Sequence, residues 1–284
     1  MFGALSQQQS GLSASNLAMK RPSCSIVIPA YNEEKRLPRT LNSIIAFREA
    51  NSWNLEVIVV NDGSKDKTAE VTRQFSANYP FIGLVDNAIN CGKGKSIRDG
   101  VDRAEGDVIF FADADDSTPI TDAEKLLQAI ESGADIAIGS RWVDRDLQVH
   151  PQPWYRRLNG RLYNLLMRTI LGLDYKDTQN GFKAYTRSAA KTIFPLQKIS
   201  GWGFDAEVLF LAQKFGFSVR EVPVEYTYYA EGSKIRPYRD GARMLSELFK
   251  VRWHELNGAY SEKATRQVST DNLPGVSLQE RTSD

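Results

Sequence analysis

The sequence predicts an α/β fold with a mainly parallel central sheet and helices on both faces of that sheet. Short apolar runs alternate with segments of helical periodicity along most of the chain, which is the order of elements in such folds. The apolar runs also lack the polar alternation of a sheet that has one face in water. A chain of 284 residues, of which 42% are hydrophobic and 25% charged, is long enough to bury the core that this sheet needs.

The first strand is expected at residues 25–29, a β-branched run ended by a proline, and the helix after it has apolar residues at helical spacing from Leu37 to Ile45. Further strands are expected at 57–60, 82–85, 108–112 and 136–138, with helices between them at 68–75, 96–104 and 122–131. Strands joined in this way are parallel, so the loops after them meet at one edge of the sheet, where open α/β sheets bind their ligands.

The two ends of the chain differ in composition from the rest. Residues 1–22 are rich in Ser, Gln and Asn and residues 262–284 hold few apolar side chains, so we expect a disordered leader and a disordered tail. Residues 23–230 are expected to form the main domain and residues 231–261 a C-terminal amphipathic helical extension. A net charge of +1 argues against nucleic-acid binding, and two cysteines argue against a disulfide framework and fit a reducing compartment.

Two carboxylates follow the strand expected at 108–112. Asp113 and Asp115 project to the same side of an extended chain, where a cation between them would relieve their repulsion. Oxygen ligands of this kind suit Mg²⁺ or Mn²⁺ carrying a diphosphate. An acidic turn with a purely structural role is the alternative.

Two other loops after expected strands carry polar residues. Asp62 is placed either to accept hydrogen bonds from a nucleobase or ribose, or to form an Asx-turn that starts a helix. The segment 90–96 is rich in glycine and lysine, but Ile89 stands where a Walker A motif needs its first glycine, so a P-loop NTPase is excluded. This segment either contacts a bound donor or forms the entry to a helix.

In this order, residues 29–33, 61–64, 92–94 and 113–115 resemble the motifs of the inverting family 2 glycosyltransferases of the GT-A fold. Within that family the chain is most similar to the dolichyl-phosphate or polyprenyl-phosphate β-glucosyltransferases, through residues 139–141, 177–183, 201–207 and 231–234. The resemblance spans about residues 24–260. Ser117 stands where mannosyl relatives carry a further metal-binding Gln, and Asn180 stands where the glucosyl branch has Cys.

The resemblance implies that residues 23–230 form a GT-A (Rossmann-like) nucleotide-sugar-binding sandwich, and it assigns roles to individual side chains. The implied donor-binding residues are Pro29, Ala30, Tyr31, Glu33, Asp62, Gly92, Lys93, Asp113 and Ala114. Asp113 and Asp115 are implied to hold Mg²⁺ or Mn²⁺ on the diphosphate. Arg141, Arg157 and Lys234 are implied to receive the phosphate of the acceptor.

The candidate catalytic residues are Asp115, Asp177 and Asp205. A lipid phosphate is already an anion and needs only cations that align it with C1 of the sugar, whereas a sugar hydroxyl needs a general base. Asp177, Asp205 and Glu207 are candidates for that base or for shaping the acceptor pocket. A buried acid that caps a helix is the alternative for Asp205.

Residues 154–168 combine arginines with apolar residues at helical spacing, which predicts a helix that lies in a membrane interface. In the alternative, Leu158, Leu162, Leu165 and Leu166 face the protein core. Residues 238–260 suggest a second amphipathic element. No apolar stretch is long enough to span a bilayer, so we expect a cytoplasmic protein at the cytoplasmic face of a membrane, held there by direct docking or by a membrane partner protein. A homo-oligomer is the other expected assembly.

We therefore predict an inverting enzyme that transfers glucose from UDP-glucose to a polyprenyl (dolichyl-type) phosphate and forms a β-linked lipid-phosphate sugar. One alternative is a family 2 transferase that uses GDP-mannose, UDP-GlcNAc or a hydroxyl acceptor on a glycan or glycolipid. Another is a non-catalytic module that binds nucleotide sugars. A nucleotidylyltransferase is disfavoured, because residues 31–34 replace the glycine-rich loop of such enzymes.

Overall fold

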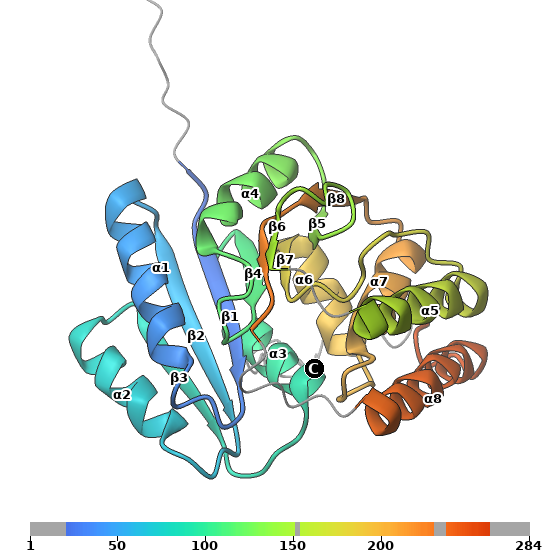
Figure 1. Ribbon diagram of the computed structural model, residues 1–284, viewed down its shortest axis with the longest axis horizontal. Coiled ribbons are helices and arrows are strands. Elements are labelled where there is room, and N and C mark those ends of the chain that lie inside the picture. The colour runs from blue at the N-terminus through green and yellow to red at the C-terminus, as the bar shows by residue number, and fades with distance from the viewer. Residues whose placement is uncertain (1–20, 151–153, 230–236, 262–284) are drawn as a thin grey trace, which may run out of the picture.

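The computed structural model describes residues 21–150, 154–229 and 237–261 (Figure 1). Its strands are β1 (Cys24–Ala30), β2 (Leu55–Asp62), β3 (Ile82–Asn87), β4 (Val108–Ala112), β5 (Ile136–Ser140), β6 (Gln148–His150), β7 (Phe182–Thr186), β8 (Val219–Pro223) and β9 (Tyr226–Thr227). Its α-helices are α1 (Leu37–Asn51), α2 (Thr68–Asn78), α3 (Lys93–Arg103), α4 (Ala123–Glu131), α5 (Trp154–Leu171), α6 (Arg187–Ile193), α7 (Phe204–Lys214) and α8 (Pro237–Leu256).

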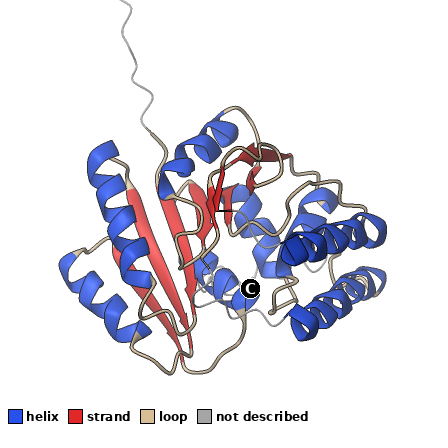
Figure 2. Ribbon diagram, viewed as in Figure 1, coloured by secondary structure: helices blue, strands red, loops and turns tan. Residues whose placement is uncertain are grey.

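A seven-stranded sheet in the order β3-β2-β1-β4-β7-β5-β8 forms the centre of the molecule, with helices on both sides of it (Figure 2). Strand β7 is antiparallel to β4 and to β5, whereas the other neighbouring strands of this sheet are parallel. The prediction of a mainly parallel sheet is confirmed. Since Phe182 pairs with Ala112, the start of β7 lies at the edge where β4 ends, and this brings residues 177–182 to the edge predicted to bind ligands.

Alternate residues of each strand pack into two hydrophobic cores, one on each face of the sheet. Val27 and Phe111 pack with α3, α6 and α7 on one face, while Ile26 and Phe110 pack with α1 and α4 on the other. This period-two arrangement explains why the strands read as unbroken apolar runs, because both of their faces are buried.

Several features go beyond the expected elements. The antiparallel β7, the edge strand β8 and the small β6-β9 sheet follow the last expected strand. Helix α3 begins at Lys93 rather than at residue 96, so residues 93–96 of the glycine-lysine segment form its first turn. Most of the predicted leader, all of the predicted tail and residues 230–236 lie outside the described residues.

Helices α5 and α8 lie side by side against the rest of the molecule (Figure 1). In α5, Met167 is buried and Leu166 packs against the core. The side chains of Leu158, Leu162 and Leu165 are more than half exposed, so the alternative in which they face the core is wrong. No helix among the described residues is long and apolar enough to cross a bilayer.

Candidate active site

The loop after β1 and the loop after β2 are joined by side-chain hydrogen bonds. The Asn32 amide donates to Ser64 Oγ (2.9 Å), and the Lys65 amide donates to Asn32 Oδ1 (2.8 Å). The Glu33 amide donates to the hydroxyl of Thr68 at the start of α2 (2.7 Å). Asn32 adopts a positive φ of 51°, a conformation that Asn tolerates better than most residues. These bonds hold the predicted donor-binding residues 29–33 in one arrangement beside the end of β2.

Asp62 fixes the entry to α3. Its two carboxylate oxygens accept hydrogen bonds from the amides of Cys91 (2.8 Å) and Gly92 (2.9 Å), and its side chain is almost fully buried. The Asx-turn alternative is wrong for Asp62, since Asn61 Oδ1 is the acceptor for the amide of Ser64 in that turn. Asp62 therefore joins the second loop to the Gly92-Lys93 segment.

Lys93 and Asp113 form an ion pair of 2.6 Å between Nζ and Oδ1. Burial alone would lower the pKa of Lys93, but the charges of Asp113 and Asp205 raise it above its ordinary value. Gly181, just before β7, lies directly against Asp113, because a Cβ placed there would come within 1.9 Å of Asp113 Oδ2. The third loop of the site thus contacts both α3 and the start of β7.

Asp115, in the same loop as Asp113, contacts a residue that follows β1. Its carboxylate accepts from the Ser117 amide (3.1 Å) and lies 3.5 Å from Arg36, which also forms a two-pronged ion pair with Glu33. Burial, together with the nearby charge of Asp113, raises the pKa of Asp115. Arg36 was not predicted, although its position three residues after Glu33 is the spacing of a local ion pair.

The donor set fits a divalent cation. Burial and then the charge of Asp113 raise the pKa of Asp115, and a cation bound between Asp113 and Asp115 would relieve the repulsion between the two carboxylates. In the described part of the chain, no cluster of three or more His, Cys, Asp or Glu side chains is arranged as a metal site. A cation held by two aspartates has coordination positions left for a diphosphate and water, as Mg²⁺ prefers.

Asp177 is the counterion of Arg141. Its carboxylate accepts from Nε (2.7 Å), from the second terminal nitrogen (2.8 Å) and from the backbone amide of Arg141 (2.9 Å). Burial alone would raise the pKa of Asp177, but the guanidinium and its hydrogen bonds lower it below the ordinary value. The guanidinium also lies 5.0 Å from the ring of Tyr226. An aspartate held in this way is a poor proton acceptor.

Asp205 is the counterion of Lys183. The ammonium of Lys183, which is fully buried, lies 2.6 Å from Asp205 Oδ1 and also donates to the carbonyl of Asn180 (2.7 Å). Burial lowers the pKa of Lys183 and raises that of Asp205, in each case against the attraction of the partner. Among the described residues, the Asp205 carboxylate accepts from Lys183 and from no backbone amide at the start of α7, so the capping alternative is wrong. Lys183 was not predicted as a site residue, because a lysine inside an apolar strand gives no sign of its partner.

Some of the remaining predicted residues lie at the site and others do not. Pro29 and Ala30 end β1, and the Ala114 carbonyl accepts from the buried Thr40 hydroxyl (2.9 Å). Glu207 is fully buried and accepts from the backbone amides of residues 198 and 199 and from the Tyr260 hydroxyl, so it supports a neighbouring segment. The side chain of Arg157 and the whole of Lys234 lie outside the described residues.

Solved structures with a similar fold include glucosyl-3-phosphoglycerate synthase from Mycobacterium tuberculosis. The structure of that enzyme with Mn²⁺, UDP and glucosyl-3-phosphoglycerate has a TM-score of 0.59, with 19% identity, covering 81% of this chain and 78% of that chain. Another structure of the enzyme contains Mg²⁺ and UDP, with a TM-score of 0.58 and 18% identity over 81% of this chain and 78% of the other. At this identity the likeness establishes the fold, and the predicted GT-A architecture is confirmed.

Sequence comparison identifies closer relatives. The dolichyl-phosphate beta-glucosyltransferase of Homo sapiens is 34% identical over 258 residues, which cover 86% of this chain and 79% of the relative. The enzyme of the same name from Saccharomyces cerevisiae is 33% identical over 258 residues, covering 84% of this chain and 76% of the relative. The predicted resemblance to this branch is therefore confirmed. Residues 25–194 match the family model described as glycosyl transferase family 2, and the chain belongs to that family of glycosyltransferases.

Proposed function

We propose that this protein is a metal-dependent inverting glycosyltransferase that transfers glucose from UDP-glucose to a polyprenyl phosphate of the dolichyl type. The product would be a β-linked lipid-phosphate sugar. Relatives named dolichyl-phosphate beta-glucosyltransferase, at 33–34% identity over most of the chain, support the sugar and the acceptor. The UDP bound to the neighbour of similar fold supports the nucleotide.

The donor would lie across the loops that follow β1, β2 and β4. Residues 29–33 and Asp62 would bind the uridine, while Lys93 and Arg36 flank the carboxylates on which the diphosphate would sit. When bound, Mg²⁺ or Mn²⁺ on Asp113 and Asp115 would supply positive charge to the leaving diphosphate. Lys93 and Arg36 add positive charge at the same place.

One observation favours a phosphate acceptor over a hydroxyl acceptor. The two aspartates that the sequence offered as general bases, Asp177 and Asp205, are both buried and both ion-paired, with Arg141 and Lys183. A hydroxyl acceptor must lose a proton, whereas a lipid phosphate needs only cations to orient it. Arg141 has five N–H donors, and those that Asp177 and Tyr226 leave would serve the acceptor phosphate.

The reaction is then a single displacement. An oxygen of the acceptor phosphate forms a bond to C1 of glucose from the face opposite the nucleotide, and the bond between C1 and the diphosphate oxygen breaks. UDP leaves with the electron pair, and no proton has to be removed from the acceptor. Arg141 orients the attacking phosphate, while Lys93 and Arg36 stabilise the charge that develops on UDP.

The acceptor places the protein at a membrane surface, and two helices offer faces that suit one. The exposed apolar residues of α5 (Leu158, Leu162 and Leu165) and of α8 (Phe249, Trp253 and Leu256) each recur at the spacing of one helix face. Because α5 and α8 lie side by side, we propose that both helices dock in the interface of the membrane.

Replacing Gly181 with Ala tests the metal ligand Asp113. The new methyl group would collide with the Asp113 carboxylate, so we expect the apparent affinity for Mn²⁺ in turnover assays to fall by about 10–100-fold. Gly83→Ala is the matched control, since the nearest atom to its added methyl is 3.8 Å away. Unchanged Mn²⁺ dependence in Gly181→Ala would show that Asp113 does not hold the metal.

A panel of acceptors tests the function itself. Purified protein with Mn²⁺ and UDP-glucose should release UDP when a polyprenyl phosphate in detergent is added, and not when the corresponding polyprenol is added. Release with the alcohol would assign a hydroxyl acceptor instead. Release of GDP from GDP-mannose, or of UDP from UDP-GlcNAc, without release of UDP from UDP-glucose would contradict the proposed donor.

A further inference from the structure

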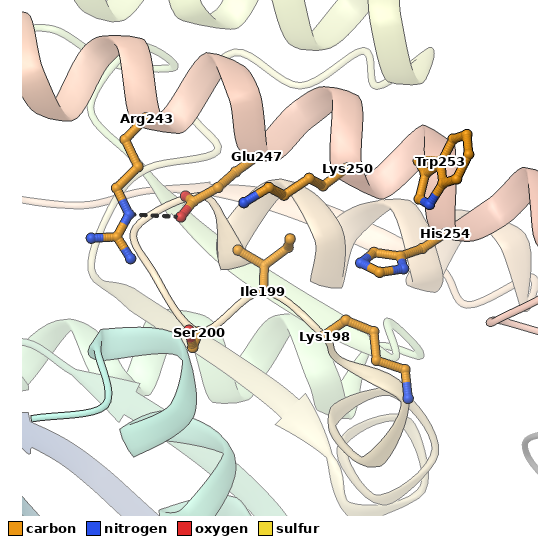
Figure 3. Close-up of a pocket in the computed structure, with 8 residues that line it drawn as sticks. All are labelled: Lys198, Ile199, Ser200, Arg243, Glu247, Lys250, Trp253 and His254. Atoms are coloured by element: carbon orange, nitrogen blue, oxygen red, sulfur yellow. Dashed lines mark hydrogen bonds and ion pairs between the residues drawn. The ribbon is translucent and has the colours of Figure 1, made fainter. Parts of the chain in front are cut away.

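A cavity of about 500 Å³ opens between α8 and the segment at residues 198–200 (Figure 3). It is lined by Lys198, Ile199, Ser200, Arg243, Glu247, Lys250, Trp253 and His254. In Figure 3, Lys250 and His254 lie on the face of α8 that is nearest to the segment carrying Lys198. None of these side chains has a role in the proposed transfer reaction.

Positive charge dominates this cavity. Its lining has three cationic side chains, Lys198, Arg243 and Lys250, against the single carboxylate of Glu247. That carboxylate is buried and already accepts from the Gly203 amide (2.7 Å) and from Arg243 Nε (3.2 Å). In the part of the chain that the structure describes, neither Lys198 nor Lys250 forms an ion pair with a carboxylate, although the charge of Lys198 acts to lower the pKa of the buried Glu207. The cavity therefore has the charge and the room to hold an anion.

The positive charges that line the cavity also act on His254. Burial lowers its pKa, and the charges of Lys198 and Lys250 lower it further. The ring of Tyr260 packs against the imidazole with centroids 6.0 Å apart, and Glu247 and Arg243 line the same cavity. An anion bound beside His254 would be attracted by the charges of both lysines.

The cavity borders the apolar face of α8. Trp253 lines it and also belongs to the exposed row with Phe249 and Leu256. This cationic cavity, next to exposed aromatic and aliphatic side chains, is complementary to a phospholipid at a bilayer surface, because the charged headgroup of the lipid lies next to its acyl chains.

We propose that this cavity binds the phosphate-bearing headgroup of an anionic phospholipid and so fixes α8 on the membrane. The proposal rests on the membrane association proposed above. The bound lipid would also influence the donor site, because Ser200 lines the cavity and contacts the start of α3. The Ser200 carbonyl accepts from the Gly94 amide (2.8 Å) and would lie 2.5 Å from a Cβ at Gly92.

Vesicle binding by the full chain tests the charge of the cavity. We compare vesicles of phosphatidylcholine with vesicles of an equimolar mixture of phosphatidylcholine and phosphatidylserine. The Lys198→Ala/Lys250→Ala variant should lose about thirty-fold in affinity for the mixed vesicles, roughly fivefold for each lysine. The control Lys125→Ala/Arg220→Ala removes the same charge from α4 and β8, far from α8 (Figure 1), and should bind like the wild type. Equal losses in both variants would overturn the proposal.

The environment of His254 tests whether the headgroup occupies the cavity itself. The chain has two histidines, so a His150→Gln variant leaves His254 as the one imidazole signal in a proton NMR titration. A short-chain, water-soluble phosphatidylserine should raise the pKa of His254, and the matched phosphatidylcholine should not. A rise with inorganic phosphate but none with phosphatidylserine would mean that the cavity takes free phosphate, and the lipid proposal would fall.

These measurements need neither donor nor acceptor, so they stand apart from the proposed reaction. The Lys198→Ala/Lys250→Ala variant should retain wild-type turnover on polyprenyl phosphate dissolved in detergent, where membrane docking is not required. Loss of that turnover with unchanged vesicle binding would show that the lysines serve the reaction and not the membrane. If turnover is absent from the wild type while binding to phosphatidylserine persists, the transfer function fails and the lipid site stands.

Discussion

Asp115→Asn is expected to reduce turnover by at least about a hundredfold, because it removes a charge that would hold the metal where the leaving diphosphate gains negative charge. It should not destabilise the fold. The pKa of Asp115 is raised by burial and by Asp113, so the folded state disfavours its ionised form and stability falls as pH rises through that pKa. At neutral pH the neutral Asn should unfold at a urea concentration no lower than the wild type.

Asp116→Asn is the matched control for this variant. Asp116 is the next residue, its carboxylate contacts Arg39 and Ser43, and its positive φ of 56° suits Asn. Steady-state rates with UDP-glucose and polyprenyl phosphate should stay near wild type in Asp116→Asn. Comparable losses in the two variants would mean that the loop needs its overall charge rather than a metal ligand at Asp115.

Lys183→Met is expected to lower the free energy of unfolding by about 3–5 kcal/mol, because it leaves Asp205 buried without its counterion. Urea denaturation measures this effect. Lys214→Met removes a lysine from a surface pair of similar length, 2.7 Å to Glu255, and should cost less than about 1 kcal/mol.

The double variant Lys183→Met/Asp205→Asn separates a buried pair from a simple packing effect. Neutralising Asp205 removes the uncompensated charge, so the double variant should be more stable than Lys183→Met alone. If the two substitutions add, or if Lys183→Met costs no more than Lys214→Met, then the ion pair does not determine the stability of this part of the core.

The sequence predicts the parallel part of the fold well, because buried strands have an unmistakable pattern. The runs at 57–60 and 108–112 lie within β2 and β4. Strand β7 is different: its direction depends on the path of the chain through α5, which local periodicity does not encode. The small β6-β9 pair is too short to leave a pattern at all.

The site was predictable where residues follow a strand and share a loop. Asp113 and Asp115 could be paired from their spacing, and the resemblance supplied Lys93. The ion pairs Arg141–Asp177 and Lys183–Asp205 could not be found in this way, because their members are 36 and 22 residues apart and meet only when β7 inserts beside β4. That insertion turns two candidate bases into counterions, which changes the chemistry expected of the acceptor.

The central claim, transfer of glucose from UDP-glucose to a polyprenyl phosphate, is tested most directly by following the sugar. Purified protein is incubated with glucose-labelled UDP-glucose, Mn²⁺ and a polyprenyl phosphate in detergent, and the label in the organic phase is identified by mass and by the configuration at C1. We predict β-linked glucosyl phosphoryl lipid that disappears with a chelator or without the lipid phosphate. Label that stays in the aqueous phase while UDP is released, or an α-linked product, would contradict the account.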